Sequence, residues 1–304
     1  MKLYAAPMEG ITTYIWRDVH RRIFGGADGY MTPFLSPNGN LTFQHKELAE
    51  ISQKEPNVVP QLITNRAEYF LWGAEEVRKL GYGEVNFNLG CPSGTVVAKH
   101  KGAGMLGDPK ELDTLLDEIF AAAPDIQISV KTRIGRYTPE EWPALMEVYN
   151  KYPIARLIIH PRVQKEMYLG KAHREAFAYA EKVAEMPLVY NGDIVSPDDP
   201  ILTTDTDVMI GRGLLMDPAL FRRIRGGEPA TREELTAYHD ALLAAYTAAY
   251  SGTLPALYKM RGLWAYLGEA FMDSERYLRV IFKAKDLTTY QTAAQTILRN
   301  CEMK

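Results

Sequence analysis

The chain contains eight short apolar runs, each of which ends in small or polar residues. In one of them, Glu84 to Leu89, apolar and polar residues alternate with a period of two, which is typical of a short strand. The runs are bounded by residues that end strands, and we expect one β-strand in each. The expected strands lie at residues 3–6, 29–32, 58–62, 85–88, 126–131, 157–160, 188–191 and 208–211.

Most of the intervals between these runs have the apolar spacing of a helix. Residues 66–80 place their apolar side chains on one face, and residues 112–120 do the same. The second helix follows Asp108-Pro109, which is a helix-start signal, and Thr138-Pro139 begins another. Only the interval 34–57 lacks a clear helical pattern, so we expect it to be mostly loop. Strands that alternate with helices in this way predict a (β/α)8 (TIM) barrel, of the α/β class.

The pattern changes after residue 228. Thr231 and Glu234 have the spacing of a capping box, and the apolar positions that follow them all have helical spacing. We expect no strand in this region. The predicted organisation is a TIM-barrel catalytic domain at residues 1–228 followed by an all-helical domain at residues 229–304.

Composition and charge narrow the classes of protein. The 304 residues carry a net charge of −3, so the total charge does not indicate a nucleic-acid-binding protein, although it allows a local basic face. Two distant cysteines argue against a disulfide framework and for a reducing compartment. The first residues are too short an apolar run for a signal peptide, and no apolar stretch is long enough to cross a bilayer. We therefore expect a cytoplasmic protein.

Candidate chemistry lies at the predicted strand ends. In a barrel of this kind, functional residues gather at the carboxyl ends of the strands. A polar or reactive group follows nearly every predicted strand, which a purely structural barrel does not require. These positions are Pro7, Met8, Gln61, Asn88, Cys91, Lys131, Arg133, His160, Arg162, Asn191, Gly192, Asp193, Gly211 and Arg212.

Three of these groups suit an anion. The glycine-containing turns 191–193 and 211–213 follow the last two strands, where such barrels commonly bind a phosphate. Lys131 ends a buried strand, where an unpaired ammonium is costly, so it should meet an anion or act as a Schiff-base amine. His160 is either a hydrogen-bonded core histidine or a member of the same site.

Cys91 follows a predicted strand directly, in the turn Gly90-Cys91-Pro92. Glycine and proline end a strand abruptly, so this turn presents the thiol on a loop. The position alone is equally compatible with a small buried hydrophobic side chain, the usual role of a free cysteine.

The segment from Asn88 to Pro92, followed by Val96 and residues 102–106, resembles the signature of the dihydrouridine synthases. These are flavin enzymes that reduce uridine in RNA, chiefly transfer RNA (tRNA). The resemblance covers the whole barrel, and the helical region agrees in size and position. Further matches are residues 6–10, Gln61, 130–133, 159–162, Tyr168, 191–193 and 209–213.

The resemblance implies FMN bound over the barrel mouth and reduced by NADPH, with the cofactor carrying the hydride chemistry. Pro7, Met8 and Gln61 would contact the isoalloxazine. Lys131 would lie near its N1/C2 edge and stabilise negative charge there, and His160 would support the flavin or its phosphate. The phosphate would be held by Asn191, Gly192, Asp193, Gly211 and Arg212.

The resemblance also implies the roles of the substrate-facing residues. Hydride would pass from flavin N5 to C6 of uracil, and Cys91 would give a proton to C5 as general acid. Asn88, Arg133 and Tyr168 would hold the uracil, which must leave its stack to reach the flavin. The loop 99–104, which has glycines and positive charge, is expected to be a mobile lid that carries Cys91 inward.

The helical domain has a local excess of basic residues, and contacts with phosphates dominate the affinity of proteins for RNA. We therefore expect RNA, most of all tRNA, to bind this domain. We expect no membrane contact, no metal ion and a monomer. The basic residues that outnumber acidic ones in this domain are Lys259, Arg261, Arg276, Arg279, Lys283 and Lys285.

Three other functions compete with this interpretation. The first alternative is a flavin barrel that reduces a free small molecule, such as a dihydropyrimidine or an enone. A second alternative is an aldolase in which Lys131 forms a Schiff base. The third is a non-catalytic RNA-binding module, which would leave the complete set of residues at the barrel mouth unexplained.

Overall fold

Eight parallel strands form a closed barrel in which each strand pairs with the next along the chain. The computed structural model describes residues 1–52, 55–122 and 124–304. The predicted (β/α)8 barrel with C-terminal helices is confirmed, and all of the predicted strands are present with small shifts at their ends. The strands are β1 Leu3–Ala5, β2 Gly29–Leu35, β3 Val58–Leu62, β4 Glu84–Leu89, β5 Gln127–Arg133, β6 Leu157–His160, β7 Leu188–Tyr190 and β8 Asp207–Ile210.

The barrel interior has an apolar part and a polar part. The apolar part is a buried cluster of side chains from the first, second and last three strands, which fills the space inside the sheet. Each of its larger side chains, those of methionine, isoleucine and valine, contributes about 1.5–3 kcal/mol through burial. Polar side chains of β3, β4 and β5 are buried as well. The apolar cluster consists of Ala6, Met31, Ile158, Val189 and Met209.

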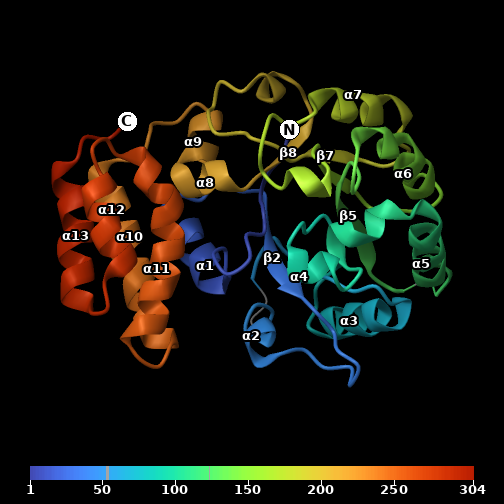
Figure 1. Cartoon of the computed structure of the whole chain (residues 1–304), viewed down its shortest axis with the longest axis horizontal. Helices are drawn as coiled ribbons and strands as arrows, with labels where there is room; N and C mark the ends of the chain where they lie inside the picture. The colour runs from blue at the N-terminus through green and yellow to red at the C-terminus, as the bar shows by residue number, and fades with distance from the viewer. Residues whose placement is uncertain (53–54, 123) are drawn as a thin grey trace. The chain divides into compact units, whose positions relative to one another are not determined.

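Helices cover the outside of the strands (Figure 1). The predicted helices are present, and Asp108 caps the second of them, because its carboxylate accepts hydrogen bonds from the backbone of Lys110 and Glu111. The interval 34–57 contains only the single turn α2 His45–Leu48 within its described residues. The outer helices are α3 Ala67–Lys79, α5 Pro109–Ala121, α6 Trp142–Tyr149 and α7 Arg174–Val183.

Short helical turns occupy several of the loops that follow strands. α4 Gly94–Val97 and η1 Gly102–Gly107 follow β4, whereas η2 Pro139–Glu141 follows β5. η3 Gln164–Glu166 follows β6, and η4 Pro200–Thr203 follows β7. The loops with α4, η1, η2 and η3 follow the carboxyl ends of β4, β5 and β6, where predicted functional residues lie.

The chain forms two compact units, each made from separate stretches of sequence. The first comprises Met1–Pro7, Asp28–Asp193 and Asp205–Met209. It contains all of the barrel strands except Ile210, the last residue of β8. The second comprises Met8–Ala27, Ile194–Thr204 and Ile210–Lys304. Compactness does not tell which residues bind RNA, so the functional division at residue 228 stays a prediction.

The second unit is helical. The predicted capping box is confirmed, because the Thr231 hydroxyl accepts from the Glu234 backbone at 3.1 Å and the Glu234 carboxylate accepts from the Thr231 backbone at 2.8 Å. Beyond residue 228 the described chain has no strand, only one isolated bridge between Phe271 and Met303. The helices are α1 Tyr14–Ile23, α8 Arg212–Met216, α9 Leu220–Ile224, α10 Arg232–Ala249, α11 Thr253–Leu267, η5 Gly268–Ala270, α12 Glu275–Lys283 and α13 Leu287–Asn300.

Helix α1, which precedes β2 in the chain, packs against α10 in this second unit. The rings of Phe24 and Tyr238 meet edge to face, with 5.4 Å between their centroids. The hydroxyls of Thr13 and Tyr246 lie 3.4 Å apart. No pattern in the sequence indicates that these distant helices share a core. None of the helices in the described part of the chain combines the length and the apolarity that crossing a bilayer requires.

Candidate active site

A chain of side-chain hydrogen bonds runs through the polar part of the barrel interior. The amide of Asn86 donates to the Ser129 hydroxyl at 2.9 Å, and the amide of Gln61 donates to Asn86 at 2.8 Å. The amide of Asn88 in turn donates to Gln61 at 2.7 Å. Strand register explains this chain, because Gln61 pairs with Asn86, and Asn86 pairs with Ser129, in adjacent strands. The buried amides therefore satisfy one another, as buried polar groups must.

The same chain fixes the turn that carries Cys91. The side-chain oxygen of Asn88 accepts from the backbone of Gly90 at 3.0 Å and from the backbone of Cys91 at 2.9 Å. Gly102 has φ +55°, and a Cβ there would lie 2.9 Å from the Cys91 carbonyl oxygen, so the chain needs glycine at this position. Cys91 is partly exposed. Its position on a loop, rather than inside the apolar core, agrees with a chemical role.

Lys131 lies beside Asn88, because the two residues pair across β4 and β5. In the described part of the chain no hydrogen bond or ion pair engages its ammonium group. Burial lowers the pKa of Lys131 to about 7, the nearby charge of Arg133 lowers it further, and Cys91 acts in the opposite direction. An unpartnered cation at this position suits an anionic ligand.

Arg133 links the Cys91 turn to the loop that follows β6. Its guanidinium donates to the Gly90 carbonyl and to the Val163 carbonyl, each at 3.0 Å, and lies 5.2 Å from the centre of the Tyr168 ring. Burial is the main reason that the pKa of Arg133 falls to about 10. The structure thus brings together Asn88, Arg133 and Tyr168, the three residues predicted to hold a uracil.

His160 is held in one tautomer. Its Nδ1 lies 2.7 Å from the backbone carbonyl oxygen of Asn191, so this nitrogen carries the hydrogen. Nε2 is then the acceptor, and Arg162 Nη1 lies 3.4 Å from it. Burial, followed by the charges of Arg133, Lys131 and Arg162, holds the pKa of His160 well below its usual value. The histidine is therefore neutral at physiological pH.

Arg162 and Asp193 form a partly buried ion pair that the sequence did not predict. Arg162 is 1% exposed, and it contacts both carboxylate oxygens of Asp193, with Nη1 2.9 Å from Oδ1. It also donates to the Leu169 carbonyl at 3.1 Å. The carboxylate of Asp193 is thus occupied by Arg162. The amide of Asn191 is also occupied, since it donates to the Met209 carbonyl at 2.7 Å.

The loop 99–104, expected to be a lid, makes specific contacts with neighbouring loops. Lys101 donates to the Ser36 hydroxyl at 3.0 Å, and the Asn65 amide donates to the Lys99 carbonyl at 3.2 Å. Burial lowers the pKa of Lys101. These contacts hold the loop against the barrel in the structure, and its movement stays a prediction.

The remaining predicted site residues are divided between the two units. Pro7 ends the first stretch of the barrel unit, whereas Met8, Gly211 and Arg212 belong to the second unit. The backbone of Met8 donates to the Thr12 hydroxyl at 2.8 Å. Gly211 precedes α8, and Arg212 is its first residue. The adjacent Gly213 has no room for a side chain, because a Cβ would lie 2.1 Å from the Ile194 carbonyl oxygen.

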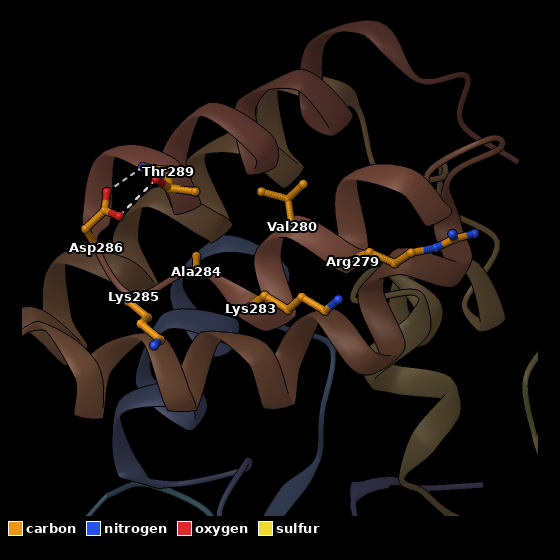
Figure 2. Close-up of a pocket in the computed structure, with 7 residues that line it drawn as sticks. All are labelled: Arg279, Val280, Lys283, Ala284, Lys285, Asp286 and Thr289. Atoms are coloured by element: carbon orange, nitrogen blue, oxygen red, sulfur yellow. Dashed lines mark hydrogen bonds between the residues drawn. The ribbon is translucent and has the colours of Figure 1, made fainter.

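The second unit contains a basic pocket of about 490 Å³ between α12 and α13 (Figure 2). Arg279 and Lys283 come from α12, and Lys285 comes from the turn that joins the two helices. The carboxylate of Asp286 is turned to the start of α13, where it accepts from the Thr289 backbone at 2.8 Å (Figure 2). Three of the six predicted basic residues therefore lie on one pocket.

Sequence reasoning missed Asn86 and Ser129 as parts of the site. Their signal was present, since both are polar residues in otherwise apolar strands, but only the strand register shows that they meet. It also missed Arg136 and Tyr137, which come shortly after β5 in the loop that follows it. No motif marks these two residues in the sequence.

The parallel barrel carries an unpartnered lysine, a loop cysteine and a neutral histidine at the carboxyl ends of its strands. This arrangement is typical of a TIM-barrel enzyme. The family model described as "Dihydrouridine synthase (Dus)" matches residues 4–302. The chain belongs to the dihydrouridine synthase family, which confirms the predicted resemblance, and the protein is an enzyme of that family.

Named relatives and solved structures agree with this assignment. The chain is 29% identical over 248 residues to a tRNA-dihydrouridine(16) synthase of Cupriavidus necator, covering 76% of this chain and 77% of the relative. It is 30% identical over 240 residues to a protein of the same name from Ralstonia nicotianae, covering 74% and 73%. The old yellow enzyme from Trypanosoma cruzi has a TM-score of 0.53 at 10% identity, covering 83% of this chain and 95% of that one, which shows a shared fold.

Proposed function

We propose that this protein reduces the uracil 5,6 double bond of uridine in RNA, namely tRNA, to 5,6-dihydrouridine, with FMN as cofactor and NADPH as reductant. The observation that carries this proposal is the turn of Cys91, which the amide of Asn88 holds next to the unpartnered Lys131. Family membership and the names of the relatives support it. We also propose that the protein is cytoplasmic and monomeric.

The residues at the barrel mouth fit a flavin. Burial and the charge of Arg133 lower the pKa of Lys131, and a bound flavin would supply an anionic partner for it at the N1/C2 edge. Pro7 and Gln61 would contact the isoalloxazine. Because Gln61 is 1% exposed, we assign it mainly to the orientation of Asn88. Neutral His160 would support the flavin either by accepting a hydrogen bond from it or by packing against it.

The phosphate of FMN would be held mainly by backbone amides. The side chains of Asn191 and Asp193 are occupied by Met209 and Arg162, so we assign the phosphate to the backbone N–H groups of Gly192 and Asp193. Backbone amides in glycine-containing turns are suitable anion donors. Met8, Gly211 and Arg212 remain part of the proposed cofactor site on the basis of the sequence.

When bound, FMN would supply the hydride for C6 of the uracil. The chain would have to deliver a proton to C5 from the opposite face, and Cys91 is the proposed general acid. The hydrogen bonds of Asn88 to the backbone of Gly90 and Cys91 fix the turn from which the thiol would act. The turn of the proposed proton donor is thus held in place before the substrate arrives.

Asn88, Arg133 and Tyr168 are proposed to hold the uracil. The Asn88 amide nitrogen uses one hydrogen for Gln61 and carries a second. Arg133 donates from Nε and Nη1 to backbone carbonyls and also hydrogen-bonds to Tyr168, so it would hold that ring beside the uracil. Tyr168 is 44% exposed and offers an aromatic face to an arriving base. The uridine has to flip out of its stack to reach these groups.

The decisive experiment removes the gene and maps dihydrouridine across total RNA. Loss at one tRNA position, restored by the wild-type gene, is the expected result. Position 16 is mapped first, because the names of the relatives include it. The purified protein should also be yellow and contain one FMN per chain. An unchanged dihydrouridine map contradicts the proposed reaction.

A Schiff-base lysine enzyme is the second candidate, because Lys131 is unpartnered and has a pKa lowered to about 7. Such an enzyme would be colourless, and borohydride would trap a carbonyl substrate on Lys131. A yellow protein that is not labelled under these conditions excludes this candidate.

A further inference from the structure

An exposed tyrosine in the loop that follows β5 has two cations close to its ring. The ring of Tyr137 is 45% exposed. The guanidinium carbon of Arg136 is 4.9 Å from the ring centre, and Lys165 Nζ is 4.8 Å from it. Among the described residues, no carboxylate forms a salt bridge with either cation. We call Arg136, Tyr137 and Lys165 the cation–tyrosine stack.

The backbone beneath this stack is fixed by hydrogen bonds. One carboxylate oxygen of Glu141 accepts from the backbone of Arg136 at 2.6 Å and from the backbone of Tyr137 at 3.0 Å. The backbone of Lys165 donates to the Arg136 carbonyl at 3.3 Å. A Cβ at Gly135 would lie 2.4 Å from the same Glu141 oxygen, so this arrangement needs glycine there. The ring is therefore exposed on a rigid support, and binding a partner costs little ordering.

The stack adjoins the Cys91 turn. Arg136 Nη1 donates to the Gly104 carbonyl at 3.2 Å, and the Gln164 amide donates to the Pro92 carbonyl at 3.0 Å. Gly107 lies under the ring, since a Cβ there would be 3.2 Å from it. Both the stack and the turn are at the carboxyl end of the barrel, where the substrate of a TIM-barrel enzyme enters.

An exposed aromatic ring with two unpaired cations has the chemistry that recognises a nucleotide. Bases of any sequence stack on an aromatic face, and lysine and arginine neutralise the adjoining phosphate. We propose that Arg136, Tyr137 and Lys165 form a nucleotide-stacking site for a nucleotide next to the uridine that is reduced. This inference rests on the proposed function, because it takes RNA as the substrate. The RNA would then contact the barrel at this site, in addition to the contacts with the helical domain that we expect.

The test measures binding and turnover separately. In Tyr137→Ala, loss of one stacked base should weaken binding of a short single-stranded RNA about 5- to 150-fold, the range that 1–3 kcal/mol of stacking gives. KM for tRNA should rise by a comparable factor, with kcat at saturating tRNA unchanged. Tyr137→Phe keeps the ring and should retain wild-type values. Lys165→Gln should reduce the salt slope of binding by about 1.

Tyr179→Ala is the matched control, since Tyr179 is a 36% exposed tyrosine on the outer helix α7. It should leave binding and KM unchanged. Wild-type affinity and KM in a folded Tyr137→Ala protein would overturn the stacking site. Because short-RNA binding needs no NADPH, this result differs from failure of the proposed function, in which the wild-type protein forms no dihydrouridine.

Discussion

The side-chain amide of Asn88 donates a 2.7 Å hydrogen bond to the amide oxygen of Gln61 inside the barrel. The oxygen of the same Asn88 amide accepts from the backbone of Cys91. One buried glutamine is therefore two hydrogen bonds away from the backbone of the proposed proton donor. The position of the Cys91 turn depends on the strands through this connection, as well as on its own glycine and proline.

Gln61→Leu should destabilise the protein by about 2–6 kcal/mol, the cost of two unsatisfied buried groups. The substitution leaves the donor of Asn88 and the acceptor of Asn86 without partners, and each unsatisfied buried group costs about 1–3 kcal/mol. Urea unfolding measures the loss. Asn65→Ala is the control, because its amide donates at an exposed position and should cost less than about 1.5 kcal/mol. Equal losses in the two variants would show that the amide chain contributes little.

Cys91→Ala should keep its fold and its FMN and should still be reduced by NADPH. Reduction of uridine should fall by about 10²–10⁴-fold, the usual contribution of a positioned general acid. Cys91→Ser should be similarly slow, because a hydroxyl is a far weaker acid than a thiol. A single-turnover assay with pre-reduced enzyme isolates this step.

Cys301→Ala is the control for the cysteine variants. Cys301 is 7% exposed and accepts a hydrogen bond from Arg232 through its backbone carbonyl, which alanine retains. Its activity should match that of the wild type. A parental single-turnover rate in Cys91→Ala would mean that the thiol is structural and that another group gives the proton.

Lys131→Met should stabilise the flavin-free protein more at pH 7 than at pH 10. The pKa of Lys131 is about 7 in the folded chain, compared with 10.5 for an ordinary lysine. Between these values the unfolded state binds more protons, so the free energy of unfolding of the wild type rises with pH across this window. The methionine variant lacks this gain. Urea unfolding of both proteins at several pH values gives the difference, and a difference that is constant with pH would contradict the lowered pKa.

Arg279→Gln and Lys283→Gln should each weaken tRNA binding and reduce its salt slope by about 1. Both residues line the basic pocket between α12 and α13. Lys182→Gln, an exposed lysine on α7, should change neither quantity. Unchanged salt slopes in both pocket variants would remove the pocket from RNA binding. Point variants suit this test better than truncation near Gly227, which would take α10 away from α1.

The sequence predicts those parts of the structure that depend on local patterns. Apolar runs locate the strands, and the rule that barrel chemistry lies at strand ends locates Cys91, Lys131 and His160. β2 continues to Leu35, beyond its predicted end, because the sheet accommodates Pro33 with a shift in register between Met31 and Phe34. A proline normally ends a strand, so the pattern placed the end too early.

Contacts between distant segments could not be predicted. The meeting of Gln61 with Asn86 depends on register, and the pairing of Asp193 with Arg162 depends on the course of two loops. Asp193 was therefore expected to face a phosphate, although its carboxylate contacts an arginine. The packing of α1 on α10 is of the same kind, because no local pattern relates the first helix to the tenth.

That packing has a consequence for how the protein is made. Thr13 and Tyr246, whose hydroxyls meet in the second unit, are 233 positions apart in the chain. During synthesis α1 leaves the ribosome early, and its buried face, which includes Trp16 and Val19, cannot pack against α10 until that helix has emerged. At about 5–20 residues per second, this delay lasts roughly 10–50 seconds. Throughout that time the part of α1 that α10 covers in the folded protein is uncovered, so the nascent chain is a candidate client for a chaperone at the ribosomal exit.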